Sequence, residues 1–187
     1  MRCFLAVPIP QMQKSVILEG LRRLQVQLPK ARWVKPEGLH ITLKFLGDLA
    51  EEKARDLVQR LRRFQLSLPS AVEVSLRGGG FFPDVRRARV AWIGGAAPGL
   101  EDWAFAASQV AEEFGVAPEG RAFALHVTLA RLERPWPQAA SRRFLQEVGN
   151  WELAPFLATE IVLFESILQP SGAVYTEKAR ISMGYEG

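Results

Sequence analysis

The stretch Leu39-His40-Ile41-Thr42-Leu43 returns later in the chain as Leu125-His126-Val127-Thr128-Leu129, and these two histidines are the only ones present. In a strand, successive side chains point to opposite faces. Each imidazole therefore shares one face with a threonine hydroxyl, while aliphatic side chains line the other face. The pattern predicts two strands, each with one polar face and one face in the core.

The recurrence of histidine with threonine is improbable by chance. The chain has only four threonines among its 187 residues. With random placement, both histidines would have threonine two positions later with a probability of roughly (4/187)², about one in two thousand. A single histidine beside an apolar run usually has a structural role and bonds a backbone carbonyl. Because the pattern occurs twice, we interpret His40 and His126 as one functional pair.

The segments around the two histidines follow the same order. Around the His40 strand, apolar periodicity predicts a strand at 2–9, helices at 11–28 and 51–64, and a strand at 71–76. The histidines are 126 − 40 = 86 positions apart, and the patterns return near this spacing at 87–93, 99–114, 137–150 and 157–163. We interpret this register as an internal duplication of a β-α-β-α-β unit, with approximate repeats at 1–86 and 87–172. Generic alternation of helices and strands is the alternative.

Turn signals complete the predicted organisation. Segments 161–168 and 173–182 flank Pro170-Ser171-Gly172, which is typical of a hairpin turn, so a C-terminal strand is expected over 173–183. Gly78-Gly79-Gly80 and Gly94-Gly95 are also expected to form turns, which leaves no linker between the halves. We therefore expect residues 1–187 to form one domain of two directly packed lobes.

Composition limits the partners and the compartment. The chain carries a formal charge of +4 and has a pI near 9.6, which favours a polyanionic partner but is also common in proteins with a merely basic surface. Cys3 is the single cysteine, which excludes an internal disulfide and a cysteine-based zinc cluster. The apolar run at 3–9 is too short to span a membrane and is interrupted by prolines. We expect a cytoplasmic protein with no membrane partner.

Two imidazoles and two hydroxyls suit an in-line displacement at phosphorus. One group must deprotonate the attacking oxygen while another, on the opposite side of the phosphate, protonates the departing oxygen. Histidine can do both near neutral pH because its ordinary pKa is about 6.5. Thr42 and Thr128 would donate hydrogen bonds to the equatorial oxygens of the phosphate. This chemistry needs no metal or other cofactor.

Other catalytic patterns fit the sequence poorly. Zinc hydrolases usually use three protein ligands, often from a His-Glu-x-x-His helix, and the two strand histidines with one early cysteine do not supply them. The P-loop pattern and the Gly-x-Ser-x-Gly nucleophile elbow are both absent from the sequence. Gly78-Gly79-Gly80 lacks the spacing of a dinucleotide fingerprint.

The chain resembles the 2H phosphoesterase superfamily, specifically the bacterial and archaeal RNA 2′,3′-cyclic phosphodiesterases, also called 2′-5′ RNA ligases. The resemblance rests on the two His-x-Thr-Leu motifs, on Ala31-Arg32-Trp33-Val34 upstream of the first and on Leu43-Lys44-Phe45-Leu46-Gly47 downstream of it. Segments 2–7, 164–166 and 172–175 also resemble that family, so the likeness covers essentially the whole chain.

The resemblance implies an α+β, bilobal fold in which two mainly antiparallel sheets flank a central cleft. It also implies hydrolysis of a terminal RNA 2′,3′-cyclic phosphate to a 2′-phosphomonoester, by a monomer without a cofactor, with reversible 2′-5′ RNA ligation as a related reaction. By position in the family, His40 would be the proton donor to the leaving 3′ oxygen and His126 the proton acceptor that activates water. The two motifs are too alike for their own chemistry to assign these roles.

Four further residues are candidates for substrate contact. Arg131 completes His-x-Thr-x-x-Arg and resembles the family's substrate-phosphate arginine, although strict alternation would put it on the wrong face unless the strand bends. Lys44 has the strand parity of His40 and Thr42 and could contact RNA. Trp33 and Phe82 stand beside basic residues, as expected for rings on which unpaired bases stack.

Two other functions remain open at the level of the sequence. The same histidine pair could cleave small cyclic nucleotides or an ADP-ribose cyclic phosphate instead of RNA ends. Alternatively, the chain could be a non-catalytic RNA-binding module whose histidines only hold phosphate.

Overall fold

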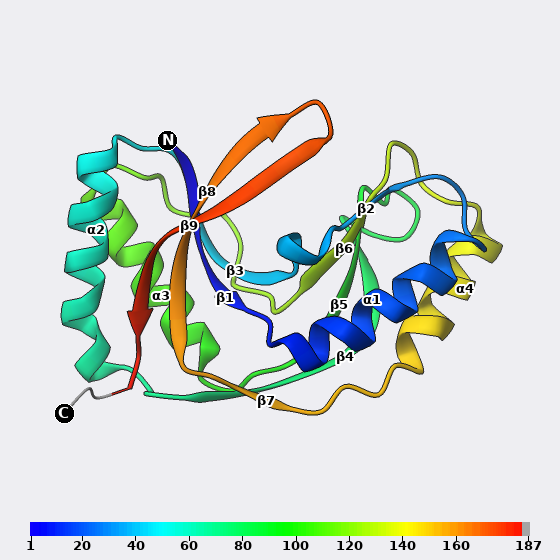
Figure 1. The fold of residues 1–187 in the computed structure, drawn as a ribbon, viewed down its shortest axis with the longest axis horizontal. Helices are drawn as coiled ribbons and strands as arrows, with labels where there is room; N and C mark the ends of the chain where they lie inside the picture. The colour runs from blue at the N-terminus through cyan, green and yellow to red at the C-terminus, as the bar shows by residue number, and fades with distance from the viewer. Residues whose placement is uncertain (185–187) are drawn as a thin grey trace.

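Strand β1 (Arg2–Pro8) lies inside the first of two antiparallel sheets, with a partner strand on each side. In this sheet, called sheet A, the order is β3 (His40–Asp48), β1, β8 (Glu160–Gln169) and β9 (Gly172–Ser182). Sheet B has the order β2 (Arg32–Trp33), β6 (Val127–Arg131), β5 (Val90–Ala96), β4 (Val72–Phe82) and β7 (Phe156–Ala158). The computed structural model describes residues 1–184, and Figure 1 shows how both sheets are arranged.

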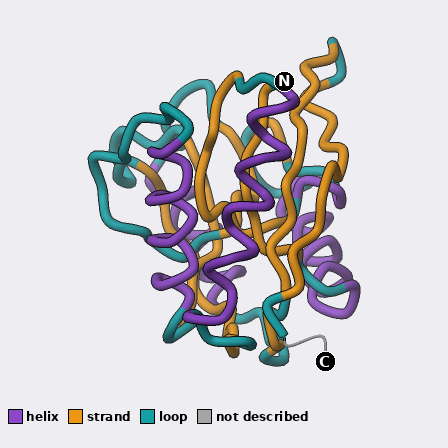
Figure 2. Tube along the Cα trace, turned by 90° about the vertical axis from the view of Figure 1, so that its left-hand side faces the viewer, coloured by secondary structure: helices purple, strands orange, loops and turns teal. Residues whose placement is uncertain are grey.

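Helices lie outside the strands in pairs, as Figures 1 and 2 show. Helix α3 (Leu100–Glu113) packs on β3, and α2 (Glu51–Phe64) packs on α3 and β9. On the other side, α4 (Gln138–Gly149) packs on β4, with α1 (Gln11–Gln25) beside it. Two short 3-10 helices, η1 (Pro36–Gly38) and η2 (Gln65–Ser67), complete the fold. Within residues 1–184, no helix is long and apolar enough to cross a membrane.

Helix pairing follows from the apolar stripe on each helix. In α2, every residue of the apolar stripe is buried, namely Ala54, Leu57, Val58 and Leu61. Ion pairs close the exposed edges of the two helix pairs. The Arg60 guanidinium binds the Glu113 carboxylate at 2.8 Å between α2 and α3, and Arg23 binds Glu147 at 2.7 Å between α1 and α4.

The two sequence halves exchange their third strands. Sheet A contains β1 and β3 from the first half, and sheet B contains β5 and β6, which stand near the corresponding positions of the second half. However, β4 joins β5 in sheet B, while β8 joins β1 in sheet A. Neither sheet can therefore be completed by one half of the chain alone. The internal duplication stays an interpretation of the 86-residue register.

The predicted fold class, α+β with two antiparallel sheets, is confirmed, as is the C-terminal hairpin of β8 and β9. The glycine turns were predicted wrongly, because both clusters lie inside strands β4 and β5. Gly78 takes a φ of +77° where the β4–β5 register shifts, so it accommodates a bulge and not a turn. At Gly80, a Cβ would stand only 2.2 Å from the Trp92 ring, so glycine gives that ring its space.

Candidate active site

The two histidines come from strands that meet although they belong to different sheets. His40 is the first residue of β3 and pairs with Pro8 at the end of β1, and His126 stands immediately before β6. Strands β3 and β6 contact each other, as can be followed at the centre of Figure 1. We call His40, Thr42, His126 and Thr128 the histidine site; all four side chains are half-buried, whereas Ile41, Leu43, Val127 and Leu129 are in the core.

A β-bulge in β3 reverses the predicted side of Lys44. Thr42 lies opposite Ala6, but Lys44 lies opposite Leu5, so Leu43 is an extra residue in β3. A bulge of this kind inverts the alternation of faces beyond it. The prediction that Lys44 shares a face with Thr42 is therefore wrong.

Lys44 instead anchors the segment that leads to His126. Its side chain is 2% exposed, and its ammonium donates a hydrogen bond to the carbonyl oxygen of Ala117 at 3.0 Å. The carboxylate of Glu119 lies 3.7 Å from the same ammonium. Since residues 116–126 form no helix or strand, this buried contact helps to fix the path of the chain into β6. Lys44 is not an RNA contact.

An equivalent bulge in β6 turns Arg131 toward the histidine site. Thr128 lies opposite Trp92 and Arg131 lies opposite Val90, which is only two positions away on β5. Leu129 is therefore the extra residue, at the same place in its motif as the bulged leucine of β3. The bulge puts Arg131 on the face of Thr128 and supplies the bend that the sequence required.

The structure separates the two aromatic candidates. Trp33 lies opposite the fully buried Ala130 and packs on Trp136, with ring centroids 5.7 Å apart, so it belongs to the core side of sheet B. This packing does not support the predicted RNA contact of Trp33, because a neighbouring basic residue does not decide the face of an aromatic ring. Phe82 is half-buried, and its ring centroid lies 4.9 Å from that of His126 in an edge-on arrangement.

The His126 ring is oriented by a backbone carbonyl. Its Nδ1 lies 2.9 Å from the carbonyl oxygen of Ala124. A carbonyl can only accept, so Nδ1 carries the hydrogen and donates it. In a neutral ring this leaves Nε2 as the atom that can accept a proton.

The His40 ring lies in an aromatic enclosure. The ring centroids of Phe4, Tyr175 and Phe164 lie 4.8, 5.4 and 6.1 Å from that of His40. Removal from water, together with the electrostatic effect of the nearby His126, Arg131 and Lys14 side chains, lowers the pKa of His40 from 6.5 to about 4. The backbone carbonyl of Gly38 acts in the opposite direction. His40 is therefore neutral at pH 7 in the free protein.

Lys14 is a charged neighbour of His40 that the helix pattern did not single out. It lies in the first turn of α1, its side chain is half-buried, and it has no side-chain hydrogen bond or ion pair with any of residues 1–184. The sequence did contain a signal for Lys14. Lys14 stands three positions before Ile17, which begins the apolar stripe, so a lysine occupies the inward face of the helix.

Residues 7–92 and 95–175 match the protein family described as LigT like Phosphoesterase. The chain belongs to this family. An RNA 2′,3′-cyclic phosphodiesterase from Methanothermobacter thermautotrophicus is 34% identical, over 94% of this chain and 95% of that protein. A protein of the same name from Thermus thermophilus is 31% identical, over 98% of this chain and 90% of its own length.

Solved structures extend the likeness of this phosphoesterase to its fold. A crystal structure of a Thermus thermophilus protein matches with a TM-score of 0.82 and 28% identity, over 100% of both chains. A crystal structure of E. coli LigT complexed with 3′-AMP matches with a TM-score of 0.71 and 25% identity, over 97% of both chains. The predicted resemblance to the 2H phosphoesterases is thus confirmed.

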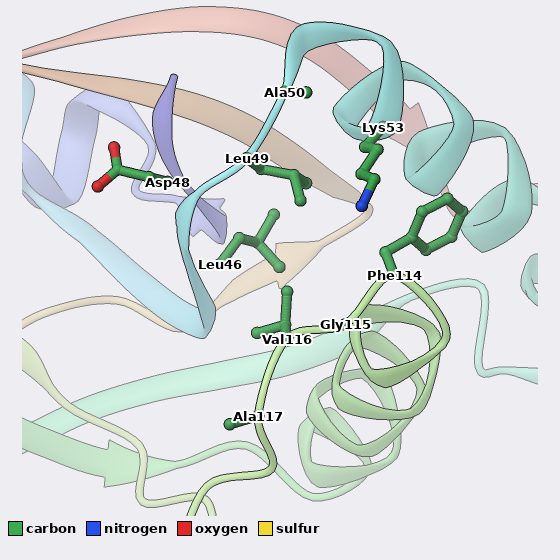
Figure 3. A pocket seen from close by; sticks show the side chains of 9 residues that line it. All are labelled: Leu46, Asp48, Leu49, Ala50, Lys53, Phe114, Gly115, Val116 and Ala117. Carbon is green, nitrogen blue, oxygen red and sulfur yellow. The ribbon is translucent and has the colours of Figure 1, made fainter.

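A cavity of the phosphoesterase lies apart from the histidine site. A cavity of about 430 Å³ lies where the end of β3 and the start of α2 meet the segment that follows α3 (Figure 3). It is lined by Leu46, Asp48, Leu49, Ala50, Lys53, Phe114, Gly115, Val116 and Ala117. Neither His40 nor His126 lines this cavity, and its charged side chains are those of Asp48 and Lys53. Among residues 1–184, no group of three or more His, Cys, Asp or Glu side chains could hold a metal ion.

Proposed function

We propose that this phosphoesterase hydrolyses the 2′,3′-cyclic phosphate at the end of an RNA to a 2′-phosphomonoester. The proposal rests on the contact between the two His-x-Thr strands. Each strand has a β-bulge at the leucine that directly follows its threonine. Relatives at 31–34% identity are named RNA 2′,3′-cyclic phosphodiesterase, and the related E. coli LigT binds 3′-AMP, which has the chemistry of one RNA nucleotide.

The proposed reaction is one in-line displacement. His126 Nε2 takes a proton from water as the water oxygen attacks phosphorus. The bond between phosphorus and the 3′ oxygen breaks, and that oxygen receives a proton from His40. The products are a 2′-phosphomonoester and a free 3′ hydroxyl, and each histidine returns to its starting state by proton exchange with solvent. If a 5′ hydroxyl of another RNA attacked in place of water, the same pair would join the two RNAs by a 2′-5′ bond.

Three groups are proposed to stabilise the charge of the phosphate. The hydroxyls of Thr42 and Thr128 lie on the same strand faces as the two imidazoles. Arg131 adds a guanidinium on the face of Thr128, where it can bind an equatorial oxygen. Hydrogen bonds that strengthen as charge develops in the transition state increase the rate. Phe82, beside His126, is the remaining candidate for contact with the RNA base.

The donor role of His40 requires that substrate binding load it with a proton. In the free protein its low pKa comes from burial and from the electrostatic effect of the nearby His126, Arg131 and Lys14 side chains. A bound phosphate would bring negative charge among these groups and raise the pKa of His40 again. The acid would then be charged only when a substrate is present. We propose a monomer that needs no metal ion or other cofactor for this step.

We expect NMR titration to follow this coupling directly, because each of the two histidines gives its own ring signals. In the free protein, His40 should titrate near pH 4. Lys14→Gln should raise this pKa because it removes a nearby positive charge, and saturating inorganic phosphate should raise it as well. Lys30→Gln, at an exposed lysine, is the matched control and should leave the titration unchanged. A midpoint near 6.5 in the free protein would contradict the account of His40.

Product analysis on an RNA with a 2′,3′-cyclic phosphate end tests the proposed function. We expect a 2′-phosphate to accumulate, with the same rate in the presence of EDTA. A 3′-phosphate product would mean that the two histidines act on the other ester oxygen. Binding of this RNA without turnover would favour a non-catalytic binding module, and strong inhibition by EDTA would overturn metal independence.

A further inference from the structure

Two arginines face each other across the strands beside the histidine site. Arg32 of β2 is the direct antiparallel partner of Arg131 of β6, so their Cα atoms are about 5 Å apart and their side chains lie on the same face. Because the β6 bulge puts Arg131 on the face of Thr128, Arg32 lies on that face too. The opposite face of β2 carries Trp33, which packs on the core.

The arginine pair lacks counter-charge within the described chain. Like charges directly opposite each other in a sheet are destabilising. Both side chains are exposed, and neither guanidinium makes an ion pair or side-chain hydrogen bond with any of residues 1–184. By contrast, other arginines of the fold, such as Arg60 and Arg180, have carboxylate partners. An anionic ligand would supply the charge that is missing beside Arg32.

Two hydrogen bonds fix the segment that follows Arg32. The amide of Val34 donates to the Leu129 carbonyl oxygen at 2.9 Å, so β2 is tied to the bulge of β6. The ammonium of Lys35 donates to the Ser171 carbonyl oxygen at 3.3 Å, in the turn between β8 and β9. A two-residue strand fixed in this way presents its arginine at a defined position.

Three positions therefore form a path that leads outward from the site. Along the face of sheet B, Arg131 follows Thr128 by about 7 Å, the spacing of two strand residues, because their partners on β5 are two positions apart. Arg32 lies one strand further out, on the edge strand of the sheet. A polynucleotide whose end lies between the histidines would pass Arg131 first and Arg32 next.

We infer that Arg32 binds the phosphodiester of the nucleotide that precedes the cyclic end, so that the site selects RNA chains over mononucleotides. This inference rests on the proposed function, since it places the cyclic phosphate at the histidine site. A guanidinium can bind such a phosphate with two parallel hydrogen bonds. A mononucleoside 2′,3′-cyclic phosphate has no such group and would leave Arg32 unused.

The test compares a dinucleotide that ends in a 2′,3′-cyclic phosphate with the corresponding mononucleotide. We expect R32Q to lower kcat/KM for the dinucleotide roughly tenfold, the size of one charge-assisted hydrogen bond, and to change the mononucleotide less than about twofold. R32Q should also reduce the salt dependence for the dinucleotide by about 0.7 in the log–log slope, the value for one phosphate contact on a single strand. R55Q is the matched control, because Arg55 is exposed on α2, away from sheet B.

Each result decides the inference. Equal losses on both substrates would overturn it, because Arg32 would then act on the cyclic phosphate or on the fold, and no loss on either substrate would overturn it as well. If the wild-type protein cleaves neither substrate, the proposed function fails separately. The anion site is then tested by calorimetric binding of a 2′-phosphorylated dinucleotide and mononucleotide, with a loss of about tenfold in dinucleotide affinity expected for R32Q and unchanged affinity as the contrary result.

Discussion

Replacing His126 by alanine should lower kcat on cyclic-phosphate-ended RNA by about 10³-fold, and His40→Ala should have an effect of the same order. General acid–base groups typically contribute 10²- to 10⁴-fold each, and in-line hydrolysis needs both at once. The double variant should be little worse than either single variant, since residues that act as a unit are strongly non-additive. Single-turnover kinetics with saturating enzyme would measure the chemical step without contributions from product release.

Matched controls separate catalysis from folding in this series. Thr176→Ala changes one of the two threonines outside the motifs, at an exposed position of β9, and should keep full activity. Thr42→Ala should lose activity, because the proposed hydrogen bond to the phosphate disappears. Thermal melting of every variant checks that the fold persists. A His40→Ala, His126→Ala double variant that keeps more than a tenth of the wild-type rate would contradict the proposal that these histidines are the catalytic acid and base.

Trp103→Ala should lower the free energy of unfolding by about 3–5 kcal/mol, the largest stability loss we expect from a single truncation in the core. Trp103 is fully buried in α3, and its indole N–H donates to the Pro69 carbonyl oxygen at 2.9 Å. Truncation would leave a cavity beneath α3 and remove the hydrogen bond to Pro69. Urea denaturation followed by circular dichroism would measure the loss.

Phe105→Ala is the control for Trp103, because Phe105 lies two residues further along the same helix and is 63% exposed. We expect it to change the free energy of unfolding by about 0.5 kcal/mol or less. If Trp103→Ala cost no more than Phe105→Ala, the packing of α3 against β3 would be wrong. Equal denaturant slopes for both variants would show that the comparison concerns stability and not a change in the unfolded state.

Local periodicity was sufficient to predict most of the elements. The helix at 51–64 was predicted with the bounds of α2, because its apolar stripe has a clear 3.6-residue period and its ends are polar. The strand β2 was missed, because a run of two residues carries no measurable period. The predicted strand at 157–163 joined most of β7 to the start of β8. The glycines in β4 and β5 led to a wrong prediction of turns. At position 80, the close approach of the Trp92 ring requires glycine inside a strand.

The sequence predicted only part of the candidate site, because it did not reveal the bulges that place Lys44 and Arg131. Strict alternation assigned Lys44 to the polar face and Arg131 to the core face, and the structure reverses both. The cause in each case is one bulged leucine, which is defined only by the pairing of two strands. Lys14 was missed for a related reason, because α1 and β3 lie far apart in the sequence until the fold brings Lys14 near His40.

By itself, the sequence determined the element types, the 86-residue register and the sharing of one strand face by each histidine and its threonine. These features depend on periodicity within single segments, and side-chain sterics set that periodicity locally. Only the tertiary structure decided that the third strands cross between sheets, that both motifs bulge, and that Arg32 stands beside Arg131. Such features arise from hydrogen bonds between segments distant in sequence, where the energy of pairing, and not the pattern of either segment, selects the register.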